Sequence, residues 1–100
     1  MKLGILVNRD NHLDAVLGIV RAARSKGHEV TVFVMDDGTK LLALAAFTAL
    51  CSSEGVTMSF CDHSAQLLSV ATGGLPEDVV RGSQYNNAVM FHTVDKAIVL

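Results

Sequence analysis

The stretch VTMSFCDHSA, residues 56–65, places a cysteine where a strand-like run gives way to polar residues. The polar residues after Cys61 can open a helix, and the unpaired N–H groups and dipole of a helix N-terminus favour a thiolate. Asp62 opposes thiolate formation through its negative charge, whereas a protonated His63 would assist it. Cys61 is therefore the candidate nucleophile, and His63 is the candidate group for proton transfer.

The second cysteine, Cys51, has a different setting. Leu44, Phe47 and Cys51 follow one another at spacings of three and four, which is typical of a helix face that packs in a core or an interface. That helix would put Cys51 and Cys61 at opposite ends of the strand predicted at 55–60. Residues 56–60 span about 16 Å, and a disulfide permits roughly 7 Å between Cα atoms. We therefore expect Cys61 to react as a single thiol.

Short strand-like runs alternate with helical patterns along the chain. Strands are predicted at 2–7, 29–35, 55–60 and 96–100, and helices at about 13–23, 39–52, 64–69 and 83–93. Asn11 is expected to cap the first helix and Gly27 to end it, while Ser83 caps the last helix. Residues 71–78 are predicted as a loop in which Pro76 can begin a further helical turn.

These elements predict an α/β fold. Strands separated by crossover helices must pair in parallel, and nearly unbroken apolar runs suit strands covered on both faces. We expect one domain over residues 1–100, with three α/β/α layers and an open, mainly parallel sheet of four to five strands. In such a sheet the carboxyl ends of the strands form the ligand-binding edge. That edge is expected to carry Asn8, Asp10, Asp36, Asp37, Cys61, Asp62 and His63.

Other polar groups allow more than one interpretation. No glycine-rich loop follows the first strand, so a nucleotide site lacks its mechanical basis and no cofactor is expected. The pair Asp36–Asp37 suits a turn or a helix cap, with a metal site including Cys61 and His63 as the alternative. The segment GSQYNN, residues 82–87, suits a capped helix start. Alternatively, it supplies hydrogen bonds beside Cys61 or across a subunit boundary through Ser83, Gln84, Asn86 and Asn87.

The composition limits the partners. The chain has a formal charge of -2 and no cluster of Lys or Arg, so it offers no footprint for nucleic acid or an anionic membrane. Its longest apolar run, residues 41–50, is about half a membrane span, and its opening is too short in apolar residues for a signal peptide. We therefore expect a cytoplasmic protein. The 41–50 run is apolar nearly all round, which favours self-association.

The order and spacing of four segments resemble the DsrE/DsrF-like sulfur-relay family, which includes the Tus-type sulfur-transfer subunits. The segments are KLGILV, AARSKGHEVTVFVMDDG, SSEGVTMSFCDHSA and GSQYNNAVMFHTVDKAIVL. In sulfur-carrying members a cysteine that follows GV and a short strand holds a persulfide, and only Cys61 matches that position. The resemblance also implies a parallel-sheet domain assembled as a trimer or hexamer.

The leading hypothesis is a small sulfur-transfer protein in which Cys61 carries a persulfide between donor and acceptor proteins or small persulfides. Its predicted catalytic residues are Cys61 and His63, and its predicted binding residues are Asn8, Asp36, Ser83, Gln84 and Asn86. One alternative is a non-catalytic oligomeric binding or scaffold subunit of the same family. Another is a metal or small-ligand module that uses Cys61, His63 and the 36–37 turn.

Overall fold

The computed structural model describes all of residues 1–100. Its strands are β1 (Lys2–Val7), β2 (Glu29–Val34), β3 (Val56–Cys61), β4 (Val79–Gly82) and β5 (Lys96–Val99). The helical segments are α1 (Leu13–Ser25), the 3-10 helix η1 (Asp36–Ala43), α2 (Ala45–Thr48), the 3-10 helix η2 (Ala49–Ser52), α3 (Asp62–Leu67) and α4 (Gln84–Thr93). None of these helices combines the length and the apolar character needed to cross a bilayer.

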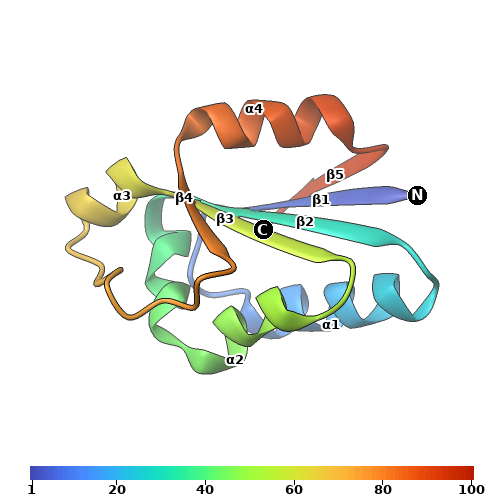
Figure 1. The fold of residues 1–100 in the computed structure, drawn as a ribbon, viewed down its shortest axis with the longest axis horizontal. Coiled ribbons are helices and arrows are strands. Elements are labelled where there is room, and N and C mark those ends of the chain that lie inside the picture. The colour runs from blue at the N-terminus through green and yellow to red at the C-terminus, as the bar shows by residue number, and fades with distance from the viewer.

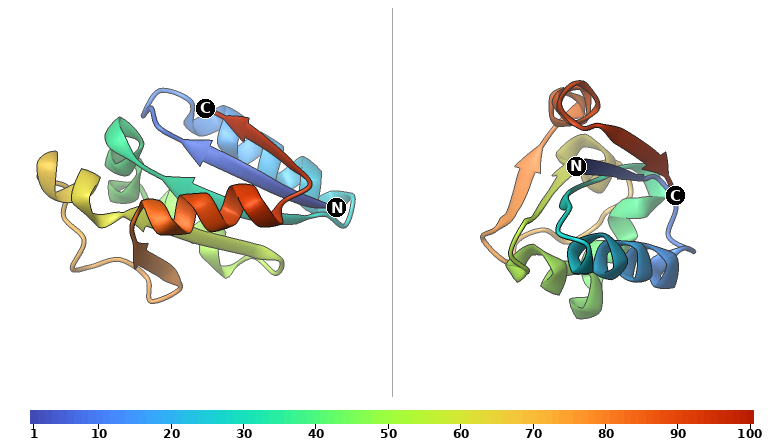
Figure 2. Two further views of the ribbon diagram at one scale, coloured as in Figure 1. Left: turned by 90° about the horizontal axis from the view of Figure 1, so that it is seen from above. Right: turned by 90° about the vertical axis from the view of Figure 1, so that its right-hand side faces the viewer.

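The five strands form one open sheet in the order β4-β3-β2-β1-β5, and every neighbouring pair is parallel. Helix α4 lies over one face of the sheet, while α1 and α2 lie on the opposite face (Figures 1 and 2). The predicted three-layer α/β fold with an open parallel sheet is therefore confirmed. Because all strands point the same way, the ends of β1, β2 and β3 meet at one edge.

The main core lies between the sheet and the α1 side. Its strand residues are mostly β-branched, because such side chains pack well on a pleated surface. Val16 and Val20 of α1 and Phe47 of α2 complete this buried cluster. Fully burying one such side chain stabilises the fold by about 1.5–3 kcal/mol, so this layer supports the sheet edge. The strand residues of the main core are Ile5, Val7, Val30, Val32, Val34, Val56, Met58, Phe60 and Val79.

The opposite face of the sheet has a smaller buried cluster, formed by Phe33, Cys61 and Met90. Leu6, Met35 and Val94 pack against it. A single helix, α4, covers this face. Earlier in β3, the side chains on the same face are polar and at least partly exposed, namely Thr57 and Ser59. Cys61 therefore belongs to the α4 layer and is separate from the main core.

The prediction of one continuous helix over 39–52 is wrong. The segment is divided into η1, a four-residue α2 and η2. Leu44 separates η1 from α2 because its backbone is extended, with φ -102° and ψ 119°. At the start of η1 the chain also runs close to β1, since a Cβ on Gly38 would lie 2.2 Å from the Val7 carbonyl oxygen. Apolar composition indicated burial here but not the breaks.

Three smaller expectations also need correction. After Pro76 the chain makes a single hydrogen-bonded turn, closed by the Val79 N–H and the Pro76 carbonyl, and then enters the edge strand β4 at Val79, which was not predicted. The N-cap of α1 is His12, without a side-chain capping bond, so Asn11 does not cap this helix. Helix α3 begins at Asp62, two residues before the predicted start.

Two predicted helix boundaries are confirmed. Gly27 follows the end of α1 with a φ of 81°, a conformation that glycine adopts at little steric cost. Ser83 is the N-cap of α4 and forms a complete capping box with Asn86. These local signals position α4 over the sheet face that contains Cys61.

Candidate functional site

Cys61 is both the last residue of β3 and the N-cap of α3. Its side chain is 3% exposed and packs with Phe33 and Met90. In the sheet register Cys61 pairs with Gly82 of β4, two residues before α4 begins. The N-terminal ends of α3 and α4 are thereby brought to the same cysteine.

The polar groups around Cys61 favour its ionised form. Burial raises the pKa of the Cys61 thiol, but hydrogen bonds from Ser64, Gln84 and the His63 backbone outweigh it. Ser64 acts through both its hydroxyl and its backbone N–H. The net result is a pKa below the ordinary value of a cysteine thiol. Because the thiolate is the nucleophilic form of cysteine, this setting suits thiol chemistry.

The negative charge of Asp62 is paired within the structure. Its carboxylate forms an ion pair with the Arg81 guanidinium and accepts a hydrogen bond of 2.7 Å from Gln66 Nε2. Arg81 also donates to Thr72 Oγ1 at 3.0 Å and lies over the Phe60 ring, 5.6 Å from its centroid. The opposition of Asp62 to a thiolate, expected from the sequence, is therefore countered by Arg81 of β4.

An open cavity of about 370 Å³ lies at the carboxyl edge of the sheet. Ser64 lines this cavity and also hydrogen-bonds Cys61. Asp36, which has a left-handed backbone with φ 47°, begins η1 beside the cavity. The structure thus brings two predicted binding residues, Asn8 and Asp36, to a hollow next to the Cys61 environment. The other lining residues are Arg9, Asp37, Leu67 and Leu68.

The remaining predicted site residues have distinct positions. His63 is exposed, and its contribution to the Cys61 thiolate comes from the backbone N–H. The Ser83 hydroxyl accepts from the Tyr85 N–H at 3.2 Å, and the Asn86 Oδ1 atom accepts from the Ser83 N–H at 3.0 Å. Ser83 and Asn86 therefore use these side-chain groups to begin α4. Of these three, only Gln84 contributes to the lowered pKa of Cys61.

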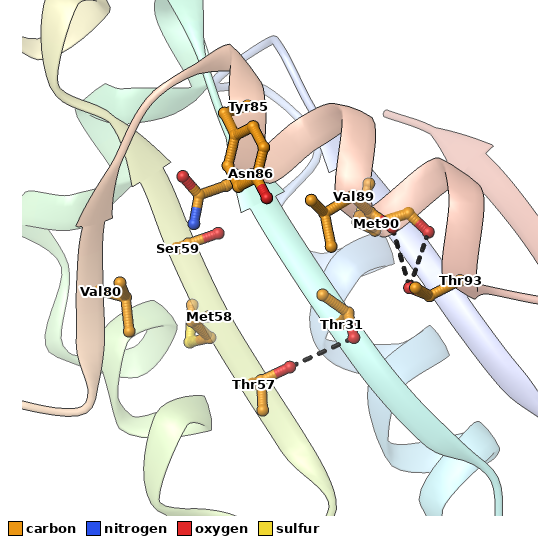
Figure 3. A pocket seen from close by; sticks show the side chains of 10 residues that line it. All are labelled: Thr31, Thr57, Met58, Ser59, Val80, Tyr85, Asn86, Val89, Met90 and Thr93. Atoms are coloured by element: carbon orange, nitrogen blue, oxygen red, sulfur yellow. Dashed lines mark hydrogen bonds between the residues drawn. The ribbon is translucent and has the colours of Figure 1, made fainter.

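A second hollow lies between α4 and strands β2 to β4 (Figure 3). Tyr85, Asn86 and Val89 of α4 form one wall, and small polar side chains of the strands form the floor. A hydrogen bond of 3.2 Å joins Thr57 to Thr31 across that floor. Cys61 does not line this groove.

Cys51 differs from Cys61 in its place in the fold and in the direction of its pKa shift. It lies in η2, is partly buried and packs against the main core. Burial and the negative charge of Asp78 raise the pKa of its thiol. Both cysteines are free thiols. No group of three or more His, Cys, Asp or Glu side chains is arranged to hold a metal ion, so Cys61, His63 and the 36–37 turn do not form a ligand set.

Sequence reasoning missed three residues near the site. Ser64, three positions after Cys61 on α3, is predicted only as the start of a helix. Arg81 was missed because its ion pair with Asp62 requires strand β4, which was not predicted. Arg9 beside Asn8 was not singled out, although it directly follows the predicted edge residue. A polar residue soon after a strand end was the available signal for Ser64 and Arg9.

Comparisons with known proteins give one family and its fold. The model of the DsrE/DsrF-like family matches residues 1–83. The crystal structure of the YchN protein from E. coli is similar, with a TM-score of 0.75, 14% identity and 100% of each chain covered. MTH1491 from Methanobacterium thermoautotrophicum, a protein of unknown function, has a TM-score of 0.70 and 16% identity, covering 99% of this chain and 98% of the other. No curated protein sequence matches the chain.

Proposed function

The chain belongs to the DsrE/DsrF-like family, and on that premise we propose that it is a sulfur-transfer protein in which Cys61 carries a persulfide. The observation that carries the proposal is the environment of the Cys61 sulfur. Hydrogen bonds from Ser64, Gln84 and the His63 backbone lower its pKa despite burial. A scaffold subunit, the alternative within the family, would not need a thiol so arranged.

The proposed reaction moves one sulfur atom in two balanced displacements. The Cys61 thiolate attacks the outer sulfur of a donor persulfide, R–S–SH. A sulfur–sulfur bond to Cys61 forms as the donor's own sulfur–sulfur bond breaks, and the donor leaves as the thiolate R–S⁻. An acceptor thiolate then attacks the outer sulfur on Cys61, and the Cys61 thiolate leaves. Each step passes the outer sulfur from one thiol to another without net oxidation or reduction. Neither step therefore needs an added oxidant or reductant.

The persulfide and the leaving thiolates are anions, and the donors around Cys61 suit that charge. The hydrogen-bond donors of Ser64, Gln84 and the His63 backbone would stabilise negative sulfur in both displacements. The imidazole of His63 is exposed. In this proposal it exchanges protons with the donor or acceptor at the surface.

The cavity lined by Asn8, Asp36 and Ser64 is proposed to receive the donor or acceptor group. Its volume of about 370 Å³ suits the end of a small persulfide or a cysteine on a partner's loop. Ser64 is the residue that lines the cavity and hydrogen-bonds Cys61. Because Cys61 is only 3% exposed, attack by its sulfur then requires a local shift at the start of α3.

The proposal includes residues 1–100 acting as one domain, in a trimer or hexamer, in the cytoplasm. Two free cysteines are consistent with a reducing compartment. Self-association is supported by an exposed apolar strip along η1 and α2. The strip consists of Ala43, Leu44, Ala45, Ala46 and Ala49. The sulfur donor and acceptor are proteins or small persulfides recognised at the cavity edge.

A transfer assay tests the function. Reduced protein is given a small-molecule persulfide and a separate acceptor thiol, and the rate of acceptor persulfide formation is measured. We expect catalysis by the wild type and by Cys51→Ser, and loss of catalysis in Cys61→Ser. Equal rates in wild type and Cys61→Ser would refute Cys61 as carrier and would favour the scaffold alternative.

A further inference from the structure

We infer that Asn87 is a positioning residue, which orients the Gln84 carboxamide so that its N–H groups face the sulfur of Cys61. This inference rests on the proposed function for its purpose, because it concerns the group that holds the reactive sulfur. Its geometry comes from three side chains at the start of α4 and the end of β2.

The first step is the position of Gln84. Gln84 is the first residue of α4 and follows Gly82, the register partner of Cys61, by two positions. Its Nε2 atom donates to the Met35 Sδ atom over 3.6 Å. Met35 packs against the cluster that contains Cys61, and the Gln84 side chain is one of the donors that lower the pKa of the Cys61 thiol. The nitrogen end of Gln84 therefore faces the Met35 sulfur, on the side of the cluster that holds Cys61.

The second step is the restraint on the oxygen end. Asn87 lies one helical turn after Gln84, and its Nδ2 atom donates to the Gln84 Oε1 atom over 3.1 Å. If the Gln84 carboxamide turned over, its oxygen would face the sulfurs and its nitrogen would face the Asn87 nitrogen. Two donors would then meet, and an acceptor would face the thiolate. The Asn87 donor thus favours the orientation that stabilises a thiolate.

The third step is an unusual feature of Asn87 itself. Its Oδ1 atom is buried and has no hydrogen-bond partner. Buried polar atoms are nearly always paired, so an unpaired one calls for an explanation. Turning Asn87 over would direct Oδ1 at the Gln84 oxygen, and the observed orientation avoids that repulsion. Keeping Gln84 directed at the sulfurs accounts for the unpaired atom.

No charged group on α4 replaces this role. The titratable groups on the elements packed around Cys61 are Asp36, Asp37 and Lys40 of η1, Asp62 and His63 of α3, Arg81 of β4, Tyr85 and His92 of α4, Glu29 of β2 and Lys2 of β1. Asp62 and Arg81 are paired with each other, and His92 is in the last turn of α4. The substitutions below leave all of these groups in place.

The test titrates Cys61 directly through the ultraviolet absorbance of its thiolate, in full-length protein carrying Cys51→Ala. The variants are Asn87→Ala, Gln84→Ala and the two combined. We expect each single substitution to move the Cys61 midpoint to higher pH and to lower the thiolate fraction below the midpoint by roughly two- to fivefold. The double variant should match Gln84→Ala alone, because Asn87 acts through Gln84.

Two further variants separate positioning from a general loss of helix stability. Thr93→Ala removes a hydrogen bond at the other end of α4 and should leave the Cys61 midpoint unchanged. Asn87→Leu keeps a similar side-chain shape, removes the amide donor and adds no charge, so it should raise the midpoint about as far as Asn87→Ala. If Asn87→Ala fails to fold, Asn87→Leu provides the test.

The inference is overturned if Asn87→Ala and Asn87→Leu leave the midpoint where it was, or if the effects of Asn87→Ala and Gln84→Ala add in full. The titration reads ionisation alone. If the transfer assay fails while the Asn87 substitutions still raise the Cys61 midpoint, the proposed function is rejected and the inference stands. If transfer succeeds while the Asn87 substitutions leave the midpoint unchanged, the inference is rejected and the proposed function stands.

Discussion

Arg81, near the end of β4, forms an ion pair with Asp62, the first residue of α3. Asp62 directly follows Cys61 in the chain, so an unpaired carboxylate there would oppose a thiolate. The pairing joins the edge strand of the sheet to the helix that begins at the cysteine. It also keeps Arg81 over the ring of Phe60, the residue before Cys61.

Removing the Arg81 charge should weaken the Cys61 nucleophile. In Arg81→Gln the Asp62 carboxylate is left without its cation, and we expect the pKa of Cys61 to rise. The pair is partly exposed to solvent, so the effect is reduced by screening, and iodoacetamide should react roughly two- to fourfold more slowly near neutral pH. The rate of alkylation is measured in protein carrying Cys51→Ala.

Arg21→Gln is the matched control, because it removes one exposed arginine from α1. It should leave the alkylation rate unchanged. An unchanged rate in Arg81→Gln, with a normal rate in the control, would show that the ion pair does not influence the thiol.

The lowered pKa of Cys61 predicts how stability depends on pH. Burial raises this pKa, but the hydrogen bonds from Ser64, Gln84 and the His63 backbone set the net shift downward. A group whose pKa is lower in the folded state contributes stability above its unfolded-state pKa, and that stability is lost as pH falls through the folded-state pKa. The free energy of unfolding should therefore rise with pH between the two values.

Urea unfolding at a series of pH values measures this effect, with Cys51→Ala as the parent protein. The parent is needed because the pKa of Cys51 is raised by burial and by Asp78, which gives the opposite pH dependence. The difference in unfolding free energy between this parent and the same protein with Cys61→Ala should increase with pH across the thiol range. A constant or decreasing difference would contradict the thiolate environment described above.

The capping box at the start of α4 predicts a loss of stability in Ser83→Ala. The Ser83 hydroxyl accepts from the Tyr85 N–H, and removing a serine N-cap typically costs about 0.5–2 kcal/mol. Urea denaturation measures this change. Ser25→Ala is a suitable control, because Ser25 hydrogen-bonds the Ala22 carbonyl at the end of α1 and caps no free N–H group. Equal effects of the two substitutions would argue against the cap.

The exposed apolar strip predicts the effect of a charge on self-association. Leu44 is 44% exposed between η1 and α2. If this strip joins the subunits, Leu44→Glu buries an unpaired charge and should convert the trimer or hexamer to monomer. Sedimentation velocity measures the assembly.

Val89→Glu places the same charge on an exposed apolar residue of α4 and is expected to retain the assembly. A monomeric wild type would contradict self-association. Loss of assembly in Val89→Glu alone would move the interface to the groove beside α4.

Much of the fold can be predicted from the sequence, because most strands appear as short apolar runs that alternate with helical patterns. The mostly apolar runs at 2–7 and 29–35 suit strands buried on both faces, and the helix between them forces parallel pairing. The Ser83 cap was equally readable, since a serine three residues before Asn86 is a local pattern. Breaks in a helix that arise from tertiary contacts could not be predicted from such local patterns. The extended Leu44 and the close approach of Gly38 to β1 break a segment whose composition suggests one helix.

The candidate site could be predicted only in part for the same reason. Cys61 was recognised from its place at a strand end, and Asn8 and Asp36 from theirs. The partners that tune the cysteine come from separate elements. Ser64 is a near neighbour in sequence, but Arg81 and Gln84 reach the site through the pairing of β4 with β3. A four-residue edge strand after a proline has too little periodicity to be distinguished from a turn.

The central claim is that Cys61 holds a transferable sulfur, and the most direct measurement is the mass of the protein after treatment with a persulfide donor. Reduced protein is loaded, freed of reagent and measured intact, and its fragments are then assigned to the two cysteines. We predict a gain of a single sulfur on the fragment with Cys61, removed by a reductant and absent in Cys61→Ser. A gain on Cys51, or an equal gain in Cys61→Ser, would contradict the account.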